Sequence, residues 1–318
     1  MSLSLLVDNL TNPALLFFVL GIVAVRLKSD LELPPTSSKF ISLYLLFAIG
    51  FKGGQELAHS EFSLEIVWSM LFGVAIASLI PLYTFFILKR RLSVSNAGAI
   101  AAAYGSVSAV TFVTAISFLE METIPFSGHM IAVMALMETP AIIIGVILIR
   151  LYGRDETTHT RLRSVVHHSF TNGSVLLIIG SLIIGFLAND QQALGIKPFT
   201  NDIFKGFLAL FLLDMGIASG RKLKDFLDGG WFTLTFALVI PLVNGCAVAL
   251  LSSWVTDDPG NRFMFAVLAA SASYIAVPAA MKMAAPQANP GIFIPMTLAV
   301  TFPLNITIGM PLYLELIL

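Results

Sequence analysis

The chain has 318 residues, of which 57% are hydrophobic and only 12% are charged, and its formal net charge is −1. This apolar fraction exceeds what a soluble domain needs to fill its core, so the composition indicates an integral membrane protein. The near-neutral charge gives no electrostatic basis for binding nucleic acid. A single cysteine, Cys246, excludes an intrachain disulfide and a multi-cysteine metal site.

Ten apolar segments are long enough to cross a bilayer, which takes roughly 17–25 helical residues. They cover residues 5–27, 38–55, 64–88, 95–119, 124–151, 172–189, 203–220, 227–255, 261–285 and 290–317. The N-terminal stretch lacks the basic region of a cleaved signal peptide, so we expect the first segment to be retained. The expected fold class is all-α and integral to the membrane, with ten transmembrane helices.

Lysine and arginine set the expected orientation, because basic residues accumulate on the cytoplasmic side of a membrane. If the N-terminus lies outside, all but four of the 18 lysines and arginines fall in cytoplasmic connections or flanks. The four on the outside are Lys52, Lys197, Lys205 and Arg262. An even number of spans then places both termini outside.

The two halves of the chain resemble each other. The matched positions, all at a similar offset, are Gly50/Gly216, Gly54/Gly220, Pro81/Pro241, Ser106/Ser271, Ser108/Ser273 and, approximately, Pro140/Pro303. Because five spans is an odd number, a second copy enters the membrane with opposite polarity, as in the inverted repeats of secondary transporters. We therefore expect one five-helix repeat over residues 1–152, a cytoplasmic linker over 153–171, and an inverted repeat over 172–318.

The fourth and ninth segments take equivalent places in these repeats, and both are interrupted, by residues 103–111 and by 268–282 with the mid-span Pro278. Backbone groups freed at membrane depth are tolerated where they line a cavity, and transporters use such broken helices to hold substrates and ions. Helix N-termini suit an anion, while freed carbonyls and hydroxyls suit a hard cation. We therefore expect an anion and Na⁺ to bind where the two segments cross. For each hydroxyl, the alternative is a structural hydrogen bond to its own helix or a neighbour.

Two sets of residues are candidates for this crossing. The substrate-binding candidates are Gly105, Ser106, Val107, Ser108, Ser273, Ala276, Val277 and Pro278. The Na⁺-binding candidates are Ser108, Thr111, Glu138, Ser271, Ser273, Thr301 and Asn305.

Glu138 is the most informative single residue. A charge at a helix centre costs roughly 2.5–3.5 kcal/mol and is tolerated mainly for function or pairing. We expect Glu138 to neutralise Na⁺, the alternative being a protonated or interface-facing side chain. Its repeat counterpart is Thr301, which with Asn305 offers uncharged oxygen ligands. Asp214 lies in a segment of the other helix class, where a packing, gating or trimer-contact role is equally compatible with the sequence.

Five stretches carry a resemblance that covers essentially the whole chain: residues 44–57, 103–111, 137–141, 212–216 and 269–289. They are similar to the sodium-dependent bicarbonate permease family known from cyanobacterial carbon-concentrating mechanisms. The resemblance implies a bacterial inner-membrane homotrimer with ten helices in a 5+5 inverted repeat with discontinuous crossing helices. The resemblance further implies that spans one, two, six and seven form a gate and the others a core. It also implies Na⁺ and bicarbonate bound where the fourth and ninth spans cross, and an elevator-like movement of core against gate.

This chain departs from the cyanobacterial proteins in three places. They carry an acidic residue where Tyr274 stands here, and Gly-Pro-Pro where this chain has Val277-Pro278-Ala279. These differences leave a different anion or a different Na⁺ count open. The long cytoplasmic loop of those proteins is shortened here to residues 153–171, which argues against a PII-like regulatory partner.

The sequence thus predicts a secondary active transporter for Na⁺-coupled uptake of bicarbonate by an elevator-type mechanism, with Na⁺ as coupling ion and no other cofactor. One alternative is Na⁺-coupled uptake of another small monoanion, such as an organic carboxylate. A different class of alternative is an anion channel or a non-transporting membrane receptor. No nucleophile–base pair is visible in the sequence, so we do not expect an enzyme.

Overall fold

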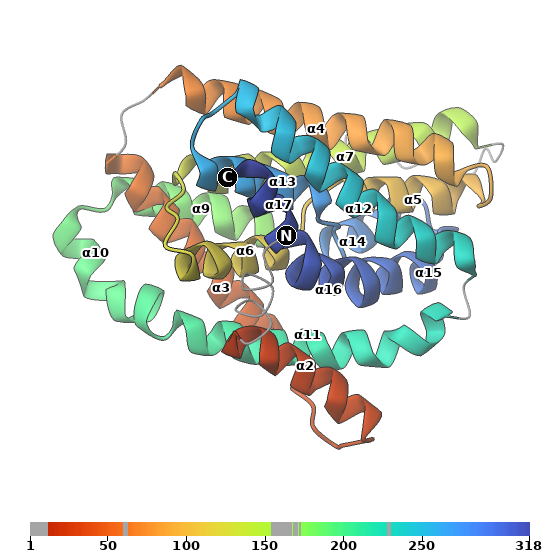
Figure 1. Ribbon diagram of the computed structural model, residues 1–318, viewed down its shortest axis with the longest axis horizontal. Coiled ribbons are helices and arrows are strands. Elements are labelled where there is room, and N and C mark those ends of the chain that lie inside the picture. The colour runs from red at the N-terminus through yellow and green to blue at the C-terminus, as the bar shows by residue number, and fades with distance from the viewer. Residues whose placement is uncertain (1–11, 60–62, 154–166, 168–170, 172, 228–229) are drawn as a thin grey trace.

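The computed structural model describes residues 12–59, 63–153, 167, 171, 173–227 and 230–318, and every regular element in these ranges is helical (Figure 1). Six helical stretches in the described chain are long and apolar enough to cross a membrane: Leu64–Leu88, Val94–Met121, His129–Tyr152, Asp190–Lys222, Trp231–Trp254 and Pro290–Ile317. Two shorter helices, Pro13–Arg26 and Gly173–Leu187, are also apolar. The fold is therefore that of an all-α membrane protein.

The elements of the first half are α2 (Pro13–Arg26), α3 (Pro35–His59), α4 (Leu64–Leu88), α5 (Val94–Gly105), α6 (Ala109–Met121) and α7 (His129–Tyr152). The second half contains α9 (Gly173–Leu187), α10 (Asp190–Lys197), the π turn η1 (Pro198–Asp202), α11 (Phe204–Leu227), α12 (Trp231–Leu251) and the 3₁₀ turn η2 (Ser252–Trp254). It continues with α13 (Pro259–Ala270), α14 (Ala276–Ala284), α15 (Pro290–Pro295), η3 (Met296–Thr301), α16 (Phe302–Leu304), η4 (Asn305–Gly309) and α17 (Met310–Ile317). Each apolar segment predicted from the sequence overlaps at least one of these helices.

The helices fall into two groups. In the first, α3 packs along α9 and α11 packs along α2. In the second, α4, α5 and α7 pack on one another, as do α12, α13 and α17. Figure 1 shows α2 and α11 along one side of the molecule and α4 and α12 along the opposite side. The second group also includes α6, which packs on α13, and α14, which packs on α5 and α7, and α6 in addition contacts α3 and α11 of the first group.

Glycines allow the first group to pack backbone against backbone. A Cβ added at Gly54 of α3 would lie 2.1 Å from the carbonyl oxygen of Leu182, and one at Gly185 of α9 would lie 2.2 Å from that of Phe51. A Cβ at Gly216 of α11 would lie 2.0 Å from the carbonyl oxygen of Phe18 in α2. Small residues at such positions let membrane helices approach closely. Gly54 and Gly216 therefore have similar roles in two separate helix pairs.

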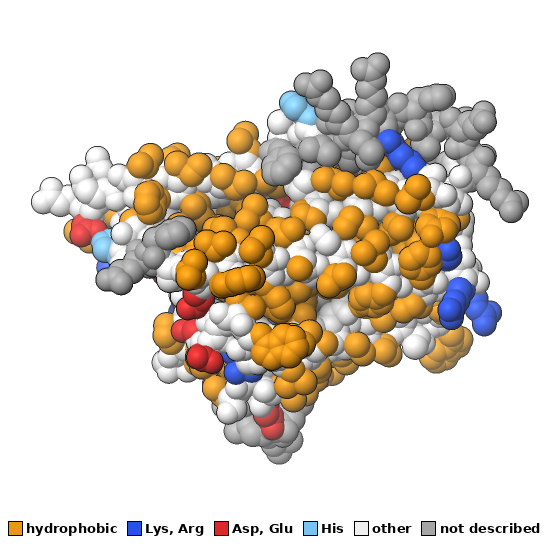
Figure 2. Space-filling model, turned by 90° about the horizontal axis from the view of Figure 1, so that it is seen from above, with side chains coloured by type: hydrophobic (Ala, Val, Ile, Leu, Met, Phe, Trp, Pro, Cys, Tyr) orange, Lys and Arg blue, Asp and Glu red, His pale blue; other side chains and the backbone are white. Residues whose placement is uncertain are grey.

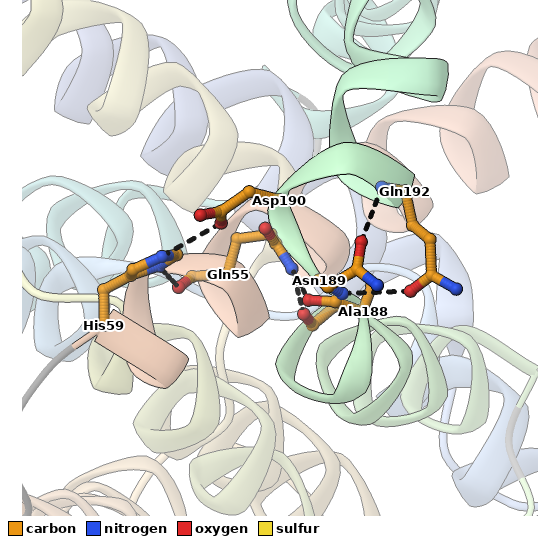
Figure 3. A network of polar contacts seen from close by, with 7 residues as sticks. Gln55, His59, Ala188, Asn189, Asp190 and Gln192 are labelled. Atoms are coloured by element: carbon orange, nitrogen blue, oxygen red, sulfur yellow. Dashed lines mark hydrogen bonds and ion pairs between the residues drawn. The ribbon is translucent and has the colours of Figure 1, made fainter.

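A polar corner joins α3, α9 and α10 (Figure 3). The Gln55 amide donates to the carbonyl oxygens of Gly185 and, at 2.8 Å, of Ala188, which have no helical partner at the end of α9. The α10 helix starts with a capping box, in which Asn189 and Gln192 each accept a hydrogen bond from the other's backbone N–H at 2.9 and 3.0 Å. The α10 helix lies outside every apolar segment predicted from the sequence, because half of its eight residues are polar.

The last apolar segment is helical but irregular. Two π turns, η3 and η4, flank α16, which contains Pro303. Proline lacks the N–H of a regular helical turn, and wide turns of this kind are a common accommodation. By contrast, Pro81, Pro140 and Pro241 lie inside the continuous helices α4, α7 and α12.

The surface has the polarity of a membrane protein. Figure 2 shows apolar side chains across the middle of one face, with Lys and Arg gathered toward one end and Asp and Glu toward the other. Trp231 and Trp254 lie at the two ends of the α12–η2 stretch and are 83% and 84% exposed. Tryptophan prefers the two interfaces of a bilayer, so this pair marks where α12 leaves the hydrocarbon.

The close packing of α9 on α3 predicts unequal effects for two glycines of the same helix. The Gly185→Ala substitution puts a Cβ against the Phe51 carbonyl and should destabilise the protein by about 1–3 kcal/mol. The control, Gly180→Ala, meets nothing within 4 Å and should be neutral or slightly stabilising. Thermal unfolding in detergent measures both. Equal melting temperatures for the two variants would contradict the packing argument.

Candidate functional site

Two helix interruptions meet inside the protein. Residues 106–108 separate α5 from α6, and residues 271–275 separate α13 from α14. The Ser271 hydroxyl accepts the backbone N–H of Ser108 at 3.0 Å, and the carbonyl oxygen of Ala103 accepts the N–H of Ser273 at 2.8 Å. The two interruptions therefore hydrogen-bond directly to each other, although they are far apart in the sequence.

The helices α6 and α14 both start at this meeting point. The Ser108 hydroxyl caps α6 by accepting the N–H of Thr111 at 3.2 Å, and the Ser273 hydroxyl accepts that of Val277 at 3.5 Å. The other N–H groups of a first helical turn have no partner within their own helix. For α6 these belong to Ala109 and Val110. Two helix starts, each with its partial positive charge, are thus brought together.

Both helix starts line one pocket, whose cavity volume is about 50 Å³. Its polar side chains are Ser42, Ser108, Glu138, Ser174, Ser273 and Tyr274. The other lining residues are Leu45, Leu46, Val107, Ala109, Val110, Val113, Met134, Ile178, Phe211, Ile275 and Ala276. A mainly apolar cavity with a few convergent polar groups is the usual form of a small-ligand site.

Glu138 is the one acidic residue among those lining this pocket. Its backbone carbonyl accepts a hydrogen bond from the Ser106 hydroxyl at 3.2 Å, which ties α7 to the first interruption. Within the described part of the chain, no hydrogen bond or ion pair reaches the Glu138 carboxylate. A carboxylate without a protein partner is suited to neutralise a bound cation.

Four substrate-binding candidates lie away from the pocket lining: Gly105, Ser106, Val277 and Pro278. A Cβ on Gly105 would lie 2.3 Å from the Pro81 ring, so this glycine allows α4 to pass close to the interruption. Val277 is fully buried, and Pro278 is the third residue of α14. There the missing proline N–H is one that has no helical partner anyway. The break therefore precedes Pro278 instead of being caused by it.

Thr301 and Asn305 already have protein partners. The Thr301 hydroxyl lies 3.0 Å from the carbonyl of Ala237 and 2.8 Å from the Tyr104 hydroxyl. The Asn305 amide donates to the carbonyl of Ala270 at 2.7 Å, and its oxygen accepts from the Tyr313 hydroxyl at 2.9 Å. Asn305 thus satisfies a carbonyl at the end of α13. Neither residue lines the pocket, nor do Thr111, Ser271 and Ser106, which are buried behind it.

Sequence reasoning missed the pocket residues contributed by the first helix group. Ser42, Ser174 and Phe211 come from α3, α9 and α11, and no motif distinguishes them in the sequence. Tyr274 had a signal, because it lies inside the second interruption. Its hydroxyl is hydrogen-bonded to Ser108 and lies 3.6 Å from the sulfur of Met215, so it spans from α6 to α11.

The comparison with protein families gives one match. A sequence model of the Na⁺-dependent bicarbonate transporter superfamily matches residues 13–318. No individually curated protein matches the chain significantly.

The Ser271 bridge leads to a stability prediction. Replacing Ser271 by alanine leaves the buried N–H of Ser108 without an acceptor, which should cost about 1–3 kcal/mol. The control is Ser253→Ala, because Ser253, like Ser271, donates to the carbonyl three residues earlier but bridges no second helix. Thermal unfolding in detergent should show a lower melting temperature for Ser271→Ala alone. A melting temperature equal to that of the control variant would mean that the bridge does not hold the interruptions together.

Proposed function

Because the chain belongs to the Na⁺-dependent bicarbonate transporter superfamily, we propose that it is a secondary active transporter that couples the uptake of bicarbonate to Na⁺. The observation that carries this proposal is the shared pocket. Two helix N-termini and a carboxylate without a protein partner line it together. An anion and a cation each find the group they require there.

Bicarbonate is held at the starts of α6 and α14. The N–H groups of Ala109 and Val110, together with those at the start of α14, face negative charge on the substrate. The hydroxyls of Ser108 and Ser273 each carry one hydrogen that can be donated to a bicarbonate oxygen. Val107 and Ala276 shape the apolar wall between these groups.

Na⁺ binds beside Glu138, with Ser108 and Ser273 as neutral oxygen ligands. Hard cations prefer oxygen ligands of this kind. Of the other predicted ligands, Thr111 and Ser271 lie directly behind these serines. Thr301 and Asn305 would have to exchange their present hydrogen-bond partners to reach the ion.

Transport proceeds by movement of the second helix group against the first, in a 5+5 inverted repeat of ten spans. Three observations support this part of the proposal. The pairs α3–α9 and α11–α2 are equivalent under such a repeat, and so are the two interruptions. The glycine contacts make each of these pairs tight. The pocket lies between the two groups, since α3, α9 and α11 line one side and α6, α7 and α14 the other.

A bacterial inner-membrane location, termini on the outside and a homotrimer complete the proposal. Most of the linker 153–171 and the first residues of the chain lie outside the described residues. A PII-like partner is not proposed, because this linker is short.

Uptake into proteoliposomes tests the function. Radiolabelled bicarbonate should accumulate against its gradient when Na⁺ is supplied outside, and not when choline replaces it. Competition by formate and acetate distinguishes bicarbonate from an organic carboxylate as the substrate. Uptake that is independent of Na⁺ and stops at equilibrium would identify an anion channel instead.

Glu138 should determine the Na⁺ dependence. The Glu138→Gln substitution keeps the shape but removes the charge that offsets a desolvated cation. We expect the Na⁺ concentration for half-maximal uptake to rise roughly tenfold, which corresponds to about 1.4 kcal/mol. The control is Asp214→Asn, because the Asp214 carboxylate is hydrogen-bonded to Ser38 and lies outside the pocket lining. Equal Na⁺ dependence in wild type and Glu138→Gln would exclude Glu138 as the ligand.

A negative charge at the start of α14 should abolish transport. Ala276 lines the pocket, so Ala276→Asp places a carboxylate where the anion binds. The control is Ala279→Asp one turn further along the same helix, where the side chain is exposed and lies outside the pocket lining. Gly105→Asp is unsuitable, because its side chain would collide with Pro81 and disturb folding. Uptake at the wild-type rate by properly folded Ala276→Asp protein would place the substrate elsewhere.

A further inference from the structure

A second pocket, with a cavity volume of about 60 Å³, lies along the same three helices as the candidate site. The first pocket is lined by Leu45 of α3, Val113 of α6 and Phe211 of α11. One to two turns further along the same helices, the second is lined by residues of all three: Ile49 and Lys52 of α3, Ile116 and Glu120 of α6, and Phe204 and Lys205 of α11. The two pockets therefore follow one another along the interface between the two helix groups.

The second pocket contains a cluster of three charged side chains. The two carboxylate oxygens of Glu120 lie 3.3 Å from the ammonium of Lys52 and 3.2 Å from that of Lys205. All three side chains are accessible to water, with Glu120 32%, Lys52 39% and Lys205 69% exposed. Ion pairs this exposed contribute little to stability, so holding the fold together is a weak reason for the cluster.

We propose that Lys52 and Lys205 form an anion-recruiting site at the mouth of the transport path, and that the Glu120 carboxylate occupies this site until a bicarbonate ion displaces it. The proposal rests on the proposed function. Bicarbonate, like a carboxylate, presents two oxygens that share one negative charge, so it fits the same two ammonium groups. On the proposed topology this end of the protein faces outside, from where the anion is taken up.

The acidic residues around this cluster explain why an anion would need the two lysines. Two glutamates, Glu56 and Glu120, also line the second pocket. Their negative charge attracts Na⁺ but repels an anion. Lys52 and Lys205 provide the local positive charge that an arriving anion needs. They belong to α3 and α11, whereas Glu120 belongs to α6, so movement between the helix groups would separate the pairs.

Whether the lysine and the glutamate substitutions raise or lower uptake distinguishes this proposal from a purely structural ion pair. A structural pair is broken equally by removing either partner, so both removals should change transport in the same direction. A carboxylate that competes with the substrate gives opposite effects. Lys205→Gln and Lys52→Gln should lower uptake at subsaturating bicarbonate at least about threefold, most strongly at low ionic strength, while Glu120→Gln should raise it. The control is Glu32→Gln, which breaks the exposed Arg221–Glu32 pair of 3.0 Å and should change nothing.

A second measurement does not depend on transport. An amine-acylating reagent that does not cross membranes modifies accessible lysines, and mass spectrometry reports the extent at Lys52 and Lys205. Sodium bicarbonate, compared with sodium gluconate at equal ionic strength, should protect both lysines, and more strongly in Glu120→Gln than in wild type. Protection without any Na⁺-driven uptake would support the anion site while refuting the proposed function. Absence of protection in both proteins, or a fall of uptake in Glu120→Gln equal to that in Lys205→Gln, would overturn the inference.

Discussion

Backbone hydrogen bonding at membrane depth is the constraint on which this structure depends. Each N–H or carbonyl left unpaired in hydrocarbon costs several kcal/mol, so a helix is interrupted there only if other groups take over. In this protein the two interruptions satisfy each other, through the Ser108 N–H with Ser271 and the Ser273 N–H with Ala103. Asn305 adds a hydrogen bond to the carbonyl of Ala270. The amides at the starts of α6 and α14 are left beside a pocket, where on the proposed function the substrate supplies the missing partner.

The interface between the two helix groups differs from the packing inside the first group. Within that group, Gly54 and Gly185 bring backbones into direct contact, which resists sliding. Between the groups, the pocket wall is mainly apolar, with side chains such as Leu45 and Phe211 beside the two serines Ser42 and Ser174. Few hydrogen bonds would have to break for one group to move past the other. The charged pairs of Glu120 span the same boundary, and because they are exposed to water they separate at low cost.

The sequence predicted correctly those features that depend on hydrophobicity or on residues typical of a helix interruption. The apolar run at residues 64–88 coincides with α4, and the serine-containing tracts at 106–108 and 271–275 are interrupted as expected. Hydrophobicity did not predict α10, because half of its residues are polar. It also could not separate residues that line the pocket from those that support it. Gly105 accommodates Pro81, and this depends on how α4 crosses α5.

The same limit applies to the pocket's far wall. Ser42 and Phe211 belong to helices distant in sequence from the interruptions, and only the packing of α3 and α11 against α6 brings them there. Pro278 was predicted to break the helix. It does lie next to the interruption, but it does not cause it. The helix restarts at Ala276 and accepts proline in its first turn, so proline marks the start of α14 and not the break itself.

The position of Glu138 explains why an anion and Na⁺ would bind together on the proposed function. In an apolar pocket the effective dielectric constant is low, so charges interact much more strongly than in water. An ionised Glu138 therefore repels bicarbonate from the helix starts as long as the site holds no cation. Na⁺ beside Glu138 cancels this repulsion and adds an attraction of its own. Since Tyr274 brings no second negative charge, neutralising one carboxylate is sufficient to let the anion bind, and coupling follows from the electrostatics of a single residue.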